Sequence, residues 1–216
     1  MKISYLCLAV TLLTTSYLFA DLTIVQKIDG GGPQLTLKFK GDLIRQDPSP
    51  EISAIINYKT GEMIHIMHLK KAFMEISAER VKTMREKNPI KPKPSPELKP
   101  SGEMEIVETT DGKFEAEKFT FETDKGIKGA YWIVKDYPNG AKILAEMNKL
   151  KGAFGSSMSA GLIPDTTKLT GFPIRSKIEF KGEKPVFSTA ISVKDTPIDD
   201  ADFKAPEGYQ EIPLPE

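Results

Sequence analysis

The stretch 63-MIHIMHLKKAFMEIS-77 decides which fold this chain can adopt, because it alternates like a β-strand while both of its faces are apolar. One face carries Met63, His65, Met67 and Leu69, and the other carries Ile64, Ile66 and His68. A sheet with one solvent-facing side would show polar residues on one of these faces. The second face must therefore contact something, and a covering helix, a metal and a ligand are the alternatives.

Most of the remaining sequence has the pattern of antiparallel strands separated by turns. In the segment 34–47, Leu35, Leu37 and Phe39 alternate with polar residues, which predicts a half-buried strand with a wet outer side. Further strands are expected at 22–28, 52–59, 103–109, 114–123, 127–136, 172–182 and 185–195. The segment 196–216 is rich in turn residues and has a few apolar anchors. The sequence therefore predicts a mainly β fold with a minor α component.

Two helices are expected. The segment 140–154 is amphipathic, because Ile143 and Met147 belong to an apolar stripe that recurs at helical spacing. The segment 78–87 is shorter, and Ser77 is placed to cap its start. Its few apolar residues can cover only a small surface.

The first twenty residues have the charge, the apolar core and the small final residue of a signal peptide, which predicts cleavage between Ala20 and Asp21 and a periplasmic or secreted protein. Cys7 is the only cysteine, so the mature chain would be cysteine-free, without disulfides or thiol chemistry. The chain carries 30 basic and 30 acidic residues, and this balance argues against a nucleic-acid partner.

The segment 88–102 contains five prolines and is expected to be an extended loop. We expect it to lie inside one β domain at 21–212, after the signal peptide 1–20 and before a short tail at 213–216. A protein partner that binds through 89–100 is a further hypothesis, because proline-rich segments serve as ligands.

The sequence lacks the motifs of the common enzyme classes, including GxSxG, HExxH and the phosphate loop, so we expect neither an enzyme nor a cofactor. Three acids, Asp199, Asp200 and Asp202, lack the spacing of a calcium loop and are interpreted as a solvated turn. His65 and His68 are three apart on a strand and should face opposite sides, so they are unsuited to sharing a metal.

Four segments in a fixed order carry a resemblance to a known family: INYKTGEMIHIMHLKKAFMEI at 56–76, YWIVKDYP at 131–138, GFPIRSKIEF at 171–180 and DTPIDDADFKAPEGYQEI at 195–212. In this order the chain resembles a domain-of-unknown-function family of exported bacterial proteins within the LolA/LolB-like lipoprotein-carrier superfamily. The resemblance covers essentially all of 21–212.

This resemblance implies a single curved antiparallel sheet, a half-open β-barrel of LolA-like type, with one amphipathic and one short helix. It further implies a non-enzymatic binding protein that takes a hydrophobic ligand, a lipid or an acyl chain, in the concave cavity, with transient membrane contact. Carriers of this kind use a basic residue near the barrel mouth, and Arg45 is a candidate by position only. The expected ligand-binding residues are Ile64, Ile66, Met67, Phe73, Met74, Trp132, Ile143 and Met147.

Two other functions remain open. One is a structural or protein-interaction module whose barrel is filled by its own side chains, in which Trp132 would be core. The other is a periplasmic copper-binding protein, because thioether and imidazole groups on the Met63-x-His65-x-Met67 face suit Cu(I). Methionine also fills irregular cores, so packing is the competing interpretation of that face.

Overall fold

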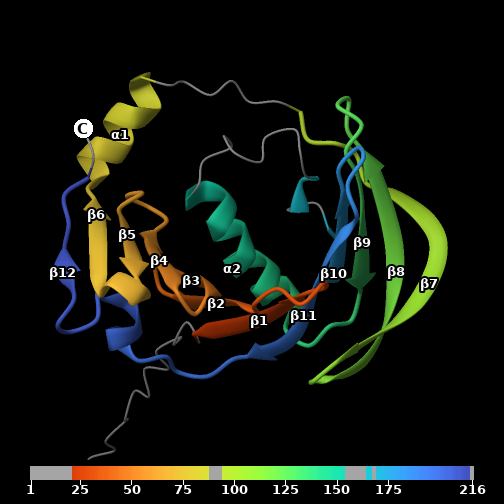
Figure 1. Cartoon of the computed structure of the whole chain (residues 1–216). Helices are drawn as coiled ribbons and strands as arrows, with labels where there is room; N and C mark the ends of the chain where they lie inside the picture. The colour runs from red at the N-terminus through yellow and green to blue at the C-terminus, as the bar shows by residue number, and fades with distance from the viewer. Residues whose placement is uncertain (1–20, 88–93, 154–163, 167–168, 215–216) are drawn as a thin grey trace, which may run out of the picture.

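The computed structural model describes residues 21–87, 94–153, 164–166 and 169–214, which form twelve strands in one open, curved, mostly antiparallel sheet and two α-helices (Figure 1). The first six strands are β1 (Leu22–Ile28), β2 (Leu35–Lys40), β3 (Leu43–Ser49), β4 (Ile52–Asn57), β5 (Met63–Met67) and β6 (Ala72–Ile76). The others are β7 (Lys99–Thr109), β8 (Gly112–Glu122), β9 (Lys128–Val134), β10 (Phe172–Glu179), β11 (Val186–Lys194) and β12 (Gln210–Glu211). The helices are α1 (Ala78–Lys87) and α2 (Gly140–Ala153), with short 3₁₀ turns η1 (His68–Lys70) and η3 (Asp200–Phe203). The predicted mainly β fold is confirmed.

The sheet has the order β12-β6-β5-β4-β3-β2-β1-β11-β10-β9-β8-β7. Each of the strands from β1 to β6 pairs with its neighbour in sequence, and so does each from β7 to β11, with α2 inserted between β9 and β10. The two runs meet where β1 pairs with β11, and β12 adds a parallel strand beside β6. Strands before and after the proline-rich segment therefore belong to one sheet.

The proline-rich segment ends earlier than the sequence indicates. Residues 94–98 have no regular structure, and β7 begins at Lys99, so Pro100 lies inside a strand. This is tolerated because β7 is the last strand of the sheet and its register shifts between Pro100 and Met104. Residues 88–93 lie outside the described part of the chain.

Helix α2 lies within the curve of the sheet, where it covers the concave face (Figure 1). Ile143 is buried there with Phe39 of β2 and Phe172 of β10, and Met147 packs against the same cluster. The helical stripe predicted from the sequence is thus the surface that fills the centre of the fold, although Phe154 lies outside the described residues. Ser77 caps α1 as expected, because its Oγ accepts a hydrogen bond from the Arg80 amide.

The outer face of the first half of the sheet is covered by the C-terminal segment. Ile198 and Phe203 of this segment pack against Ile55 of β4 and Ile66 of β5, and Tyr209 joins the same cluster. This answers why the strand at 63–67 is apolar on both sides. Its second face contacts the chain's own tail.

Replacing Ile66 by Ala should lower the free energy of unfolding by about 2–5 kcal/mol, because the side chain is fully buried under the tail and its loss leaves a cavity. Met67→Ala on the neighbouring residue is the matched control and should cost less, since Met67 is only partly buried. Urea unfolding of both variants, followed by circular dichroism, measures the difference. Equal losses would show that the tail does not seal the outer face.

Candidate functional site

A cleft of about 680 Å³ opens on the concave side of the second half of the sheet. Trp132 and Ala130 of β9 contribute to its floor, with Lys118 and Thr120 of β8 beside them and Phe187 of β11 opposite. The register places these side chains on one face, because Lys118 pairs with Trp132, Thr120 pairs with Ala130, and Lys177 pairs with both Ala130 and Phe187.

The aromatic floor of the cleft is flanked by cations. The Arg175 guanidinium lies 5.1 Å from the Trp132 ring centre and 4.6 Å from that of Phe187. The Lys118 ammonium lies 5.8 Å from the Trp132 ring centre. These distances fall within the range of cation–π attraction. Arg175 reaches this face through an irregularity in β10, where the register with β9 shifts between Pro173 and Arg175.

Two hydrogen-bond donors beneath the cleft have no partner in the described part of the chain: Trp132 Nε1 and Arg175 Nε. Both atoms are buried, and a buried donor without an acceptor raises the free energy of the folded state. The other end of the Arg175 guanidinium forms only a long ion pair, 3.6 Å from Asp29. Two buried donors without an acceptor among the described residues therefore lie next to the cleft.

The rim of the cleft has charges of both signs. Lys118 pairs with Glu103 at 2.6 Å, and Lys177 pairs with Glu179 at 2.8 Å. Because these lysines are only partly exposed and already paired, the positive charge at the rim is balanced locally. Arg175 is the cation placed nearest to the aromatic rings.

The concave side of the first half of the sheet has a different lining. His65 pairs directly with Met74 on β6, and Met67 follows on the same face of β5. All three side chains are partly buried. Burial lowers the pKa of His65 below its ordinary value, so its imidazole is neutral at pH 7.

The eight expected ligand-binding residues are divided between the two faces. Five lie on the concave side or on the helix that covers it, namely Met67, Met74, Trp132, Ile143 and Met147. Three pack in the outer cluster with the tail, namely Ile64, Ile66 and Phe73. These three do not line the concave side, because adjacent residues of a strand face opposite ways and the tail occupies the outer side.

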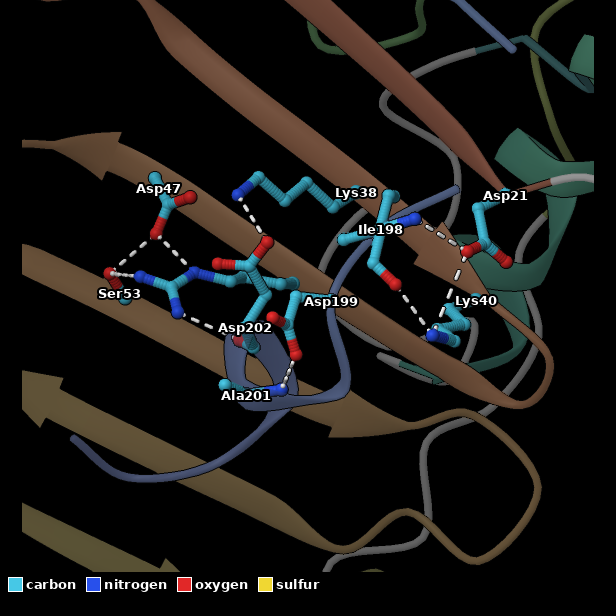
Figure 2. A network of polar contacts seen from close by, with 10 residues as sticks. Asp21, Lys38, Lys40, Asp47, Ser53, Ile198, Asp199, Ala201 and Asp202 are labelled. Atoms are coloured by element: carbon cyan, nitrogen blue, oxygen red, sulfur yellow. Dashed lines mark hydrogen bonds and ion pairs between the residues drawn. The ribbon is translucent and has the colours of Figure 1, made fainter. Parts of the chain in front are cut away.

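Arg45 also faces outward, and it anchors the tail. Its guanidinium donates hydrogen bonds to the Asp202 carbonyl at 2.7 Å, to Asp47 at 2.8 Å and to the Ser53 hydroxyl at 3.1 Å. Figure 2 shows Asp47, Ser53 and Asp202 converging at this point. Arg45, the candidate for the basic residue at the mouth of the cavity, thus lies instead at the contact between the sheet and the tail.

The same network contains a chain of hydrogen bonds through Ser53, His68 and Tyr209 that sequence spacing did not reveal. The Ser53 Oγ lies 2.7 Å from His68 Nε2, and His68 Nδ1 lies 3.1 Å from the Tyr209 hydroxyl. Serine, histidine and an orienting group at these distances are the geometry of an activated nucleophile. Tyr209 is far from the other two in sequence, so only the packed tail completes the arrangement.

The Ser53 hydroxyl is nevertheless inaccessible and fully occupied. Ser53 is 1% exposed, and its hydroxyl donates to Asp47 while accepting from Arg45 and from His68 Nε2–H. The Tyr209 hydroxyl then donates to His68 Nδ1, so the imidazole is bonded at both nitrogens. With no open face on the serine, the network has the character of a structural junction.

The three acids lie on the short turn η3 or just before it, where Asp199 and Asp200 are exposed as predicted, and two of them also pair with lysines of β2. Asp202 pairs with Lys38 at 2.9 Å, and Asp200 pairs with Lys40 at 2.6 Å. The hydrogen bond from Lys40 lowers the pKa of the Asp200 carboxyl. Lys40 Nζ also donates a hydrogen bond to the Ile198 carbonyl, and the Ile198 amide donates one to the Asp21 carboxylate (Figure 2). Asp200 and Asp202 thus fasten the tail to β2, and Asp21 holds it beside the start of β1.

The described residues contain neither a histidine-, cysteine- and carboxylate-based metal cluster nor a membrane-spanning helix. No three side chains of histidine, cysteine, aspartate or glutamate converge there in an arrangement that could hold a metal ion. Within the same residues, every helix is too short or too polar to cross a membrane.

Comparisons with known proteins provide no identification: no protein-family model matches the chain, and no curated protein matches it significantly.

Replacing Ser53 by Ala should reduce the free energy of unfolding by about 1–3 kcal/mol, because His68 Nε2–H loses its acceptor in a buried place. Ser192→Ala on β11 is the control, since the Ser192 hydroxyl makes no hydrogen bond to a buried side chain in the described structure. Thermal unfolding of both variants checks this. Unchanged stability in Ser53→Ala would contradict the structural role of the network.

Proposed function

We propose that this chain is an exported, non-enzymatic binding protein of LolA-like type, which holds a lipid or an acyl chain against the concave face of its sheet. The observation that carries the proposal is the cleft over Trp132, where aromatic floor, cations and two unpaired donors meet. Its volume of about 680 Å³ lies within the range of small-molecule sites.

The architecture supports the proposal. An open, curved sheet with a helix in its concave face is the arrangement that the family resemblance implies. All four segments that carry the resemblance have defined structural roles: 56–76 forms the strands under the tail, 131–138 leads into α2, 171–180 contains β10, and 195–212 covers the outer face. The proposed export rests on residues 1–20, which lie outside the described part of the chain.

The lining of the cleft indicates the chemistry of the ligand. Phe187 is partly exposed above the buried Trp132 and offers apolar surface, whose burial would drive the binding of an acyl chain. The Arg175 guanidinium beside them favours a carboxylate or another anionic acceptor at one end of that chain. An amphiphile such as a long-chain fatty acid satisfies both requirements.

A self-filled barrel is the second candidate, and the packing of α2 favours it. Ile143 is 2% exposed and packs with core residues from both halves of the sheet. A helix packed in this way behaves as permanent core, and the concave face near it has no free surface. In this case the protein would act through contacts with another protein, for which the proline-rich 89–100 stays the predicted partner-binding segment.

Fluorescence of Trp132 distinguishes the two candidates, because it is the only tryptophan in the chain and lies in the cleft. Adding a fatty acid such as palmitate should shift its emission in a saturable way. Thr120→Phe, which fills the cleft, should weaken this response roughly tenfold, whereas Ser176→Phe on the opposite face of the same sheet should retain it.

Native mass spectrometry of the protein purified from periplasm without detergent completes the test. A dissociable lipid mass that is lost in Thr120→Phe would support the carrier. A bare mass, together with a Trp132 emission that ignores palmitate, would overturn the carrier and leave the self-filled barrel.

A further inference from the structure

The concave side of β4, β5 and β6 places His65 at the centre of a patch of thioether and alkyl side chains. Along β5 its neighbours on the same face are Met63 and Met67, and across the strands they are Ala54 and Met74. The corners of the patch are also apolar, with Ile52 and Ile56 on β4 and Ala72 and Ile76 on β6. A histidine is thus enclosed by eight apolar neighbours, of which three are methionines.

The register shows that this patch belongs to the concave side. Met63 pairs with Ile56, and Ile56 pairs with Ile44. Ile44 belongs to the main core cluster together with Ile143 of α2. Direct partners in an antiparallel sheet share a face. The methionines therefore lie on the side that the helix covers, opposite the cluster beneath the tail.

His65 differs from the other histidine in its hydrogen bonding. His68 is bonded at both ring nitrogens, whereas His65 makes no hydrogen bond or ion pair to any described residue. It is half-buried among apolar side chains. A neutral imidazole with a free nitrogen lone pair, held in apolar surroundings, is the form that binds a metal.

We propose that His65, Met74 and one or both of Met63 and Met67 form a binding site for Cu(I). Thioether sulfur and imidazole nitrogen are soft or borderline ligands that select Cu(I) over hard cations. No carboxylate lies among the eight neighbours of His65, so the patch offers nothing that Mg²⁺ or Ca²⁺ prefers.

The spacing of the strands suits this ligand set. Directly opposed residues have Cβ atoms about 5 Å apart, so His65 and Met74 can approach one ion from two strands. Met63 and Met67 each lie about 6.8 Å from His65 along β5, a gap that the flexible methionine side chain can span. Ala54, on the other side of His65, is small and leaves room for the imidazole to turn.

The structure supplies what the sequence pattern lacked. Alternation along 63–67 places Met63, His65 and Met67 on one face, but their spacing along the strand is long for three ligands of one ion. The pairing of β5 with β6 adds Met74 directly beside the histidine. The proposed site is also separate from the Trp132 cleft, which is lined by β7 to β11, so failure of either proposal leaves the other standing.

Anaerobic titration with Cu(I) in competition with bicinchoninate tests the site. We expect the protein to take one Cu(I) per chain from the chelator. If residues 1–20 are retained, Cys7 is replaced by Ser, because a thiol would bind Cu(I) by itself. His65→Leu, and the triple variant Met63→Leu, Met67→Leu and Met74→Leu, should lower the affinity by roughly one order of magnitude or more.

The methionine-to-leucine changes conserve volume and should leave the fold intact, which circular dichroism and thermal unfolding verify. The matched control is Met84→Leu with Met104→Leu, since these two methionines are exposed on α1 and β7. The control should bind Cu(I) like the unmodified protein. Equal loss in control and triple variant, or no transfer of Cu(I) at all, would overturn the proposal.

Methionine methyl NMR with Ag(I), a redox-inert substitute for Cu(I), locates the bound ion. The ε-methyl signals of Met63, Met67 and Met74 should move with saturation, and those of Met84, Met104 and Met147 should not. Uniform shifts over all methionines would identify nonspecific thioether binding, and unmoved signals would show that the three side chains serve only as core.

Discussion

The cover that the tail places over the outer face of strands β4 to β6 is the constraint on which this structure depends. A strand that is apolar on both faces stays folded only when both faces are covered, since each exposed isoleucine forfeits about 1.5–3 kcal/mol of transfer free energy. Here the tail covers the outer face through Ile198 and Phe203, and on the concave side Ile56 of β4 is fully buried while the side chains of β5 are partly buried. Because the tail comes from a distant part of the chain, the first strands cannot reach their final environment before the last residues are in place.

The polar contacts around the tail add direction to this apolar packing. Arg45 holds the Asp202 carbonyl, and Lys38 and Lys40 hold Asp202 and Asp200. Ion pairs at partly exposed sites contribute little stability each. Their geometry nonetheless fixes where the tail crosses the strands, so that Tyr209 meets His68 and the last strand, β12, aligns with β6. Hydrophobic burial stabilises the contact between tail and sheet, and the charged groups determine where along the strands the tail lies.

The two halves of the concave side have different chemical character. Over β7 to β11 the lining is aromatic and charged, with Trp132 and Arg175 as its centre. Over β4 to β6 it is aliphatic and rich in sulfur, with His65 as its only polar group. The aromatic, charged surface and the sulfur-rich surface thus lie apart on one sheet, separated by β3, β2 and β1.

The sequence alone determined the strands, the helix α2 and the anchoring residues of the tail, because alternation and helical spacing are local properties of the chain. It also separated His65 from His68, although His68 lies in the 3₁₀ turn η1 after β5 and not on the strand that the alternation predicted. It could not determine what covers each face of 63–67. Ile64, Ile66 and Phe73 were therefore expected to bind a ligand, whereas in the structure they pack against the tail. Likewise, the Ser53–His68–Tyr209 junction and the approach of Arg175 to Trp132 depend on the long-range pairing and an irregular register in β10. Only the tertiary structure decides these contacts, because they join residues whose separation in sequence carries no periodic signal.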